Sequence, residues 1–127
     1  MKLVNLSDSN IAIKGHDLVS YTTGSPTQGE PSLTVAHDGG IYHFCSEDNK
    51  TQFEADPALY LPQYGGFCAM GVFQGKRIDI DPTAFLVADN KLFVFANTDQ
   101  KTTWEADENN HIKTADGQWT QGELTAS

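Results

Sequence analysis

Four side chains in this sequence have the types and spacing that could bind a metal ion. Cys45 follows His43 by two residues, Cys68 is the only other cysteine, and His16 lies upstream. Thiolate and imidazole groups suit a soft or borderline ion such as Cu(I), Cu(II) or Zn(II). Because residues two apart on a strand share a face, His43 and Cys45 could contact the same ion. The plain alternative is a buried Cys45 beside an exposed His43.

The two cysteines lie at positions 45 and 68, and a helix followed by a turn could bring them together. If they meet, they form a disulfide in an oxidising compartment or a dithiolate site in a reducing one. The alternative is two separate thiols in the core. Either cysteine could also act as a nucleophile with a histidine base. The sequence contains no signature of a hydrolase, a phosphate-binding loop or a zinc protease, so we expect no enzyme activity.

Asp17 directly follows His16, and two roles are open to it. A carboxylate beside a histidine can fix the imidazole tautomer in a metal or acid–base site. An aspartate can equally start a turn by accepting hydrogen bonds from its own backbone, and we favour this second role. His37 and His111 lie in a hairpin strand and a polar helix, and we expect both at the surface.

The totals describe a small acidic globular protein. The 127 residues fit a single domain, residues 1–127, and no internal repeat is apparent. Seventeen acidic and eight basic residues give a formal net charge of −9, which disfavours nucleic acids and anionic membranes as partners. Association with a second copy or with another protein is compatible with this composition.

No apolar run reaches the roughly 20 residues of a membrane span. Residues 1–8 lack the apolar core of a secretory signal. We therefore expect a soluble cytoplasmic protein, with the trimmed mature part of an exported protein as the alternative.

The order of the predicted elements favours an α+β fold, with antiparallel hairpins packed against several short helices. Two strands should flank the turn signal Asp38-Gly39-Gly40, and a second hairpin should span residues 85–95. Ser46 should cap a helix that ends near Ala55, after which Asp56-Pro57 starts a short second helix. A strand is expected over residues 68–72. Two C-terminal helices should follow, the first capped by Thr98 or Asp99.

An aromatic cluster crowds the first half of the chain. Such a cluster usually forms core, with tyrosine hydroxyls at its margin, and a small-ligand pocket is the alternative. Its members are Tyr21, Tyr42, Phe44, Phe53, Tyr60, Tyr64 and Phe67.

From residue 14 to about residue 72 the sequence resembles the YHS domain, a module related to heavy-metal-binding modules of the TRASH type. The resemblance is carried by Asp17-Leu18-Val19-Ser20-Tyr21, by Tyr42-His43-Phe44-Cys45-Ser46, and by Phe53, Pro57 and Tyr60. It implies a YHS core at about 14–72, followed by a hairpin and helices at about 81–120.

Metal-binding YHS domains in copper ATPases have cysteines where this sequence has Ser20 and Asn49, so only Cys45 is kept of three thiol positions. A longer bacterial branch, largely of unassigned function, is more similar. It shares an element like residues 15–21 and one like Gln63-Tyr64-Gly65-Gly66-Phe67-Cys68-Ala69. In that branch tyrosine tends to stand at position 16 and serine at position 45.

These substitutions suggest a small site of Cys45 and Cys68, completed by His16 or His43, in a non-enzymatic module for metal handling or sensing. We expect copper, because two thiolates suit the low coordination number of Cu(I), with zinc as the alternative. Two other functions stay open. One is a small-ligand or protein-interaction module with structural cysteines, and the other is a thiol redox protein with a Cys45–Cys68 pair.

Overall fold

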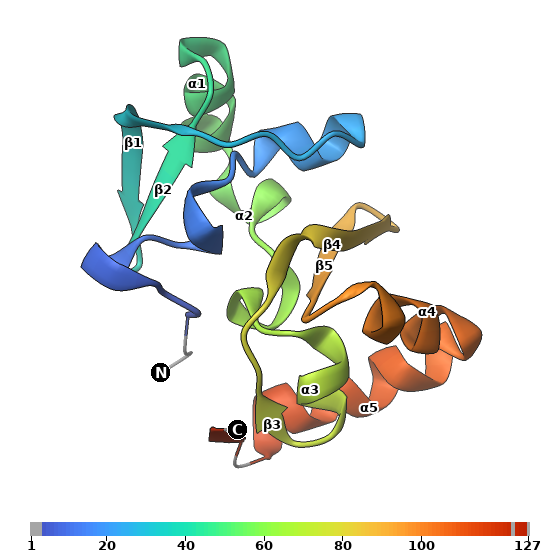
Figure 1. Ribbon diagram of the computed structural model, residues 1–127. Coiled ribbons are helices and arrows are strands. Elements are labelled where there is room, and N and C mark those ends of the chain that lie inside the picture. Colours follow the sequence, from blue (N-terminus) through green and yellow to red (C-terminus); the bar gives the residue numbers. More distant parts are fainter. Residues whose placement is uncertain (1–3, 123, 127) are drawn as a thin grey trace.

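The computed structural model describes residues 4–122 and 124–126 of the chain. Two antiparallel hairpins and a set of short helices make up most of it, which confirms the predicted α+β class. Figure 1 shows the β1–β2 hairpin and α1 in the upper part of the molecule and α3, α4 and α5 in the lower right.

The helices and strands follow one another in this order: η1 (Asp8–Asn10), η2 (Ile13–Gly15), η3 (Val19–Thr23), β1 (Glu30–His37), β2 (Gly40–Phe44), α1 (Glu47–Ala55), α2 (Pro57–Tyr60), η4 (Gln63–Gly66), α3 (Ala69–Phe73), β3 (Lys76–Arg77), β4 (Asp81–Ala88), β5 (Lys91–Phe95), α4 (Thr98–Ala106), α5 (Glu108–Gln121) and β6 (Thr125–Ala126). The η elements are 3-10 helices. Strands β1 and β2 pair antiparallel, as do β4 and β5, whereas the short β3 and β6 pair parallel.

The predicted local signals at the first hairpin and helix are confirmed. Asp38 and Gly39 both have positive φ, as a tight hairpin turn requires. Ser46 caps α1, because its Oγ accepts a hydrogen bond from the amide of Asn49 at 3.1 Å. Pro57 then stands at the first position of α2.

Two local predictions in the second half are wrong. Residues 69–73 form helix α3 rather than a strand, and Gly75 ends this turn with a positive φ of 81°. A run of five apolar or small residues has no period that separates a strand from a short buried helix. The cap of α4 is Asn97, whose side chain accepts from the amide of Gln100, and not Thr98 or Asp99.

The chain contains two copies of one structural unit, spaced by 51 residues. Strands β1 and β4 start at residues 30 and 81, β2 and β5 at 40 and 91, and helices α1 and α4 at 47 and 98, and each pair has the same length. Both hairpins carry the same break in pairing register, which lies between residues 30 and 34 in the first and 81 and 85 in the second. We call residues 11–57 copy one and residues 62–108 copy two.

Single hydrogen bonds repeat at the same spacing. The amide of Asp17 donates to the carbonyl of Thr27 at 2.8 Å, and the amide of Cys68 donates to that of Ile78 at 2.9 Å. Isolated bridges join residue 11 to 41 and residue 62 to 92. The expectation that the chain has no repeat is therefore wrong.

One hydrophobic core serves both copies. Phe53 in copy one and Trp104 in copy two are fully buried at equivalent positions. Phe53 packs on Phe44 with ring centroids 5.1 Å apart, and Trp104 packs on Phe95 at 5.8 Å. His111 stacks on Trp104 at 5.5 Å and is buried, so its expected surface position is wrong.

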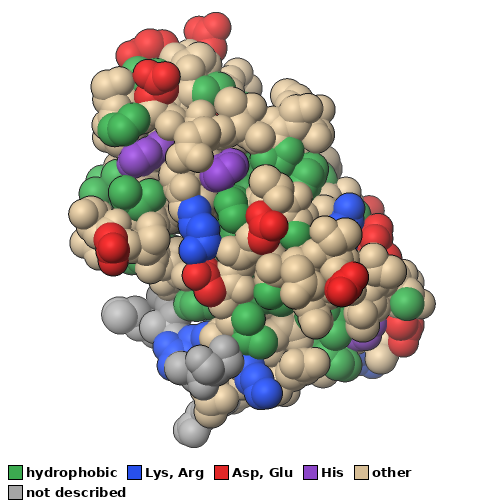
Figure 2. Space-filling view, in the orientation of Figure 1, with side chains coloured by type: hydrophobic (Ala, Val, Ile, Leu, Met, Phe, Trp, Pro, Cys, Tyr) green, Lys and Arg blue, Asp and Glu red, His purple; other side chains and the backbone are tan. Residues whose placement is uncertain are grey.

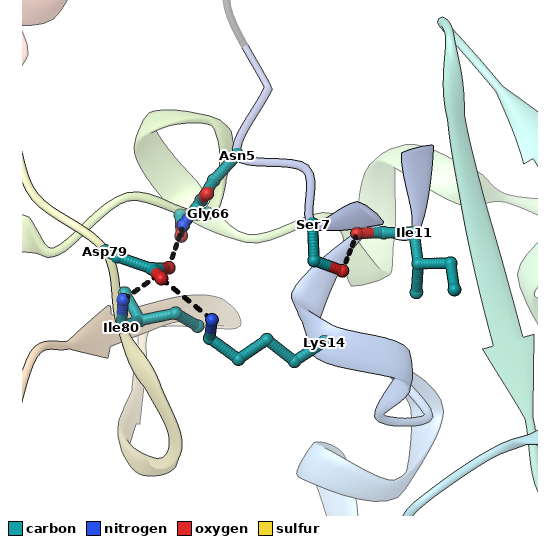
Figure 3. Close-up of polar contacts among 7 residues, drawn as sticks. All are labelled: Asn5, Ser7, Ile11, Lys14, Gly66, Asp79 and Ile80. Atoms are coloured by element: carbon teal, nitrogen blue, oxygen red, sulfur yellow. Dashed lines mark hydrogen bonds and ion pairs between the residues drawn. The ribbon is translucent and has the colours of Figure 1, made fainter. Parts of the chain in front are cut away.

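The copies are also joined by a polar contact at their margin. The Lys14 Nζ atom lies 2.8 Å from the Asp79 carboxylate, which also accepts from the Asn5 side chain at 3.0 Å (Figure 3). Partial burial alone would raise the pKa of Asp79. Hydrogen bonds from Lys14, Asn5 and the Ile80 amide outweigh it and lower the pKa below the usual aspartate value.

Acidic groups are spread over the face drawn in Figure 2. Within residues 4–122 and 124–126, no helix is long and apolar enough to cross a membrane.

We predict that removing either buried ring destabilises the whole chain in one transition, because the two copies share a core. Phe53→Ala and Trp104→Ala should each lower the free energy of unfolding by about 3–5 kcal/mol in urea denaturation. Leu59→Ala, at a side chain that is 52% exposed, should stay within about 0.5 kcal/mol of the wild type. Separate unfolding transitions for the two copies in either variant would contradict a shared core.

Asp79 should contribute a pH-dependent part of the stability. Its pKa is lower in the folded state, so the ionised carboxylate stabilises the fold above the unfolded value of about 3.9 and loses this effect as the pH falls through the folded value. Asp79→Asn should therefore be less stable than the wild type at pH 7, and the two should converge in strong acid. Urea denaturation at both pH values measures this, with the exposed Glu105→Gln as control. A difference that persists in strong acid would refute the assignment.

Candidate functional site

The candidate site of copy one is built around the carboxylate of Asp17, which is fully buried. Its Oδ1 atom accepts from the amides of Val19 at 2.7 Å and Ser20 at 3.2 Å. The predicted turn role of Asp17 is thereby confirmed. The Oδ2 atom accepts from the Cys45 amide at 2.9 Å and from the Asn49 side chain at 2.8 Å. The carboxylate thus connects η3 to the junction of β2 and α1.

Cys45 lies at that junction, between the end of β2 and the cap of α1, and is partly exposed. The Asp17 carboxylate beside it and partial burial together raise the pKa of its thiol. The Asn49 amide, 3.5 Å from Sγ, acts in the opposite direction but is outweighed. At neutral pH Cys45 is therefore a protonated thiol with access to solvent.

Ser20 and Asn49, at the two positions where the resemblance implies cysteine, both belong to this network. The Ser20 Oγ atom donates to the Asp17 carbonyl and accepts from the Thr27 amide at 2.8 Å. Asn49 donates to Asp17 and to Cys45. The two positions where the resemblance implies thiol ligands are therefore held by side chains that form hydrogen bonds within the protein.

The two predicted histidines lie close to this network. His16 immediately precedes Asp17 and forms an isolated bridge with Gln28. The His43 ring packs against Gly15, because its Nδ1 atom lies 3.4 Å from where a Cβ on Gly15 would stand. The Nδ1 atom of His16 is buried and has no hydrogen-bond partner among the described residues. An ion could bind this nitrogen without breaking a hydrogen bond.

Cys68 has a different environment. It precedes α3 in copy two, is 1% exposed, and belongs to the hydrophobic core. Both cysteines are free thiols. The repeat places Cys68 at the position equivalent to Asp17, whereas the equivalent of Cys45 is Ala96. The structure thus brings His16, His43 and Cys45 to neighbouring segments of copy one and places Cys68 in the core of copy two.

Copy two has no room for the polar network of copy one. The equivalent of Ser20 is Gly71, where an added Cβ would approach the Ile78 side chain to 3.0 Å. A serine or cysteine at this position would require that side chain to move. The network around Cys45 is therefore specific to copy one.

The groups around Cys45 do not form a closed metal site. The Asp17 carboxylate accepts four hydrogen bonds, about as many as its lone pairs allow. Among the described residues, no group of three or more His, Cys, Asp or Glu side chains is placed to hold a metal ion. In copy one, the Cys45 thiol is the soft donor that an ion can reach from solvent. A site that joins Cys45, Cys68 and a histidine stays a prediction.

Sequence reasoning missed the contact of Asp17 with Cys45. It identified the local turn of Asp17 but not its second oxygen, which reaches an amide 28 residues away. The repeat provides a different signal, which shows that Cys45 and Cys68 belong to different copies. Glu54-Ala55-Asp56 recurs as Glu105-Ala106-Asp107, and alignment on these residues places Asp17 opposite a cysteine.

Comparison with known proteins gives one partial likeness to a copper transporter. A copper-transporting P-type ATPase of Rhizobium leguminosarum bv. viciae is 49% identical over 45 residues, which make up 35% of this chain and 5% of that protein. The chain thus matches a small part of its relative. No family model matches the chain, and no solved structure matches it.

We predict that Cys45 reacts slowly with iodoacetamide at neutral pH, because Asp17 keeps its thiol protonated. In a Cys68→Ala background, the midpoint of the alkylation rate against pH should lie above the free-cysteine value of about 8.5. In urea the same chain should return to the ordinary midpoint. Mass spectrometry after timed quenching measures the rate, and equal midpoints in the folded and unfolded states would contradict the contact.

Asp17→Asn should expose the structural role of the carboxylate. Asparagine keeps one acceptor oxygen but turns an amide group toward two donors, and each buried donor left unpaired costs about 1–3 kcal/mol. We expect a lower free energy of unfolding in urea and, where the variant is folded, faster alkylation of Cys45. Unchanged stability would show that the four hydrogen bonds contribute nothing. Cys68→Asp is the matched test, because it places a carboxylate at the equivalent position in the apolar core of copy two. We expect this variant to be destabilised.

Proposed function

We propose that this chain handles copper as a cargo ion and that Cys45 supplies the sulfur that contacts it. The observation that carries this proposal is the 45-residue likeness to a copper-transporting ATPase. The YHS resemblance supports Cys45, because it implies a thiol ligand at this position. Cys45 is also the partly exposed cysteine, whereas Cys68 is buried.

The environment of Cys45 favours temporary binding over permanent storage. When a Cu–S bond forms, the thiol releases its proton to solvent, and its raised pKa makes this release costly at neutral pH. Binding therefore strengthens as the pH rises and weakens as it falls. Such a thiol takes only a fraction of the copper from a ligand that binds the ion more tightly, and it releases the bound ion readily.

One thiolate leaves a Cu(I) ion with an open coordination position. The second ligand is supplied either by the molecule that delivers the ion or by an imidazole of copy one. The Nδ1 atom of His16, which has no hydrogen-bond partner among the described residues, is a candidate. Cys68 could contribute only if the core around α3 opens. Zn(II) fits less well, because it prefers four ligands in a tetrahedral arrangement. A reducing compartment such as the cytoplasm would keep both thiols free.

The proposal predicts that copper binding depends on Cys45 and not on Cys68. Anaerobic Cu(I) titration against a chromophoric chelator should give one weakly bound ion in the wild type and in Cys68→Ala, and a loss of at least about tenfold in affinity in Cys45→Ala. The two variants remove the same atom and so control for each other. His16→Gln against His43→Gln then identifies the imidazole.

Two results would overturn this account. Equal affinity in the wild type and Cys45→Ala would remove Cys45 from the site. An equally large loss in both alanine variants, with native circular dichroism, would instead support the two-cysteine site that the sequence predicts. A Cys45–Cys68 disulfide that forms and breaks reversibly in a thiol titration would favour the redox alternative.

A further inference from the structure

A cavity of about 460 Å³ lies away from the Cys45 network, between the two copies. Its walls come from four places: Val4, the first hairpin, residues 61–65 and the second half of α5. This volume falls in the range of small-molecule sites, which are also commonly found between structural units. The small-ligand alternative considered for the sequence requires such a cavity.

The cavity exists because the two copies end differently. Helix α2, which begins at the last residue of copy one, has four residues, whereas the equivalent helix α5, which begins at the last residue of copy two, has 14. The added turns carry Asp116, Trp119 and Thr120 to the cavity wall opposite residues 61–65. These residues have no counterpart in copy one, so nothing in the common scaffold requires them.

Three aromatic rings from three different elements line the cavity. They are Tyr42 of β2, Tyr64 of η4 and Trp119 of α5. The rings of Tyr64 and Trp119 meet edge to face with centroids 6.3 Å apart. The two tyrosines are buried, at 3% and 4% exposure, so their rings are fixed by packing. Fixed aromatic faces bind a ligand at a low entropic cost.

The charged groups of the cavity are mainly acidic. Asp38 and Asp116 line it, and no lysine or arginine is among the described residues that do. Asp116 Oδ1 accepts the Tyr64 hydroxyl at 2.8 Å, which fixes the carboxylate toward the rings. The charge of Asp38 is offset only when His37, 3.3 Å away, is protonated. With the net charge of −9, this arrangement attracts cations and repels anions.

We propose that this cavity binds a small organic ammonium ion with an apolar body. The aromatic faces would contact the ammonium head through cation–π interactions, for which tryptophan is the strongest partner, and the carboxylate of Asp116 would balance its charge. The cavity volume allows an apolar group of several carbons beside the head. This binding is independent of copper at Cys45, since the two sites share no residue.

Choline and its uncharged analogue 3,3-dimethylbutan-1-ol test this proposal, because they differ in charge and hardly in shape. In a titration followed by amide and indole NMR, choline should shift the signals of Trp119 and Gly65 in a saturable way. The analogue should bind at least about fivefold more weakly. The amide of Gly24, which follows η3 and does not line the cavity, serves as the internal reference.

Asp116→Asn and Trp119→Leu should each weaken choline binding about fivefold or more, while Glu54→Gln, an exposed carboxylate on α1, should not. Asparagine keeps an acceptor for the Tyr64 hydroxyl, so the loss would reflect charge. The inference fails if choline gives no saturable shift at these residues, if the analogue or benzoate binds as tightly as choline, or if the two cavity variants bind like the wild type. Copper affinity should be unchanged in both cavity variants.

Discussion

One buried carboxylate determines how the candidate site is arranged. Asp17 accepts four hydrogen bonds from three separate segments, so it fixes η3, the end of β2 and the first turn of α1 relative to one another. A buried carboxylate is tolerated only when its hydrogen-bonding capacity is filled. These bonds fill the acceptor capacity of Asp17 and so make it unavailable as a metal ligand, while the carboxylate itself raises the pKa of the Cys45 thiol. The arrangement of the site and the protonation of its thiol therefore both depend on Asp17.

Comparison of the two copies shows what takes the place of this carboxylate when the chain does without it. Copy two keeps the hairpin, the cap and the buried ring of copy one, but its equivalent position holds Cys68 in an apolar core. There Gly71 packs directly against Ile78, which leaves no room for the serine that completes the network in copy one. One scaffold is thus stable with either a satisfied polar network or close apolar packing. Only the polar version leaves a thiol at the surface.

Local features were predictable from the sequence where a few adjacent residues determine them. The turn at Asp38-Gly39 follows from the need for positive φ, and the cap at Ser46 follows from the unpaired amides of a helix start. The helix over residues 69–73 was missed because a short apolar run has no clear period. The repeat was missed because caps, turns and buried positions recur at a spacing of 51 residues while most side chains differ. Phe53 and Trp104 illustrate this, since both fill the same place with different rings. The contact of Asp17 with Cys45 and the cavity beside α5 depend on tertiary packing, which no local pattern encodes.

The most direct test of the account is a map of amide shifts when Cu(I) is added anaerobically to uniformly labelled protein. The account predicts shifts at Cys45, the Asn49 side chain and the segment of residues 16–20, because these groups share hydrogen bonds around one thiol. The amides of Cys68 and Ile78 should stay unchanged. Shifts at Cys68 and Ile78 as large as those at Cys45 would mean that the core thiol also binds the ion, and they would contradict a site confined to copy one.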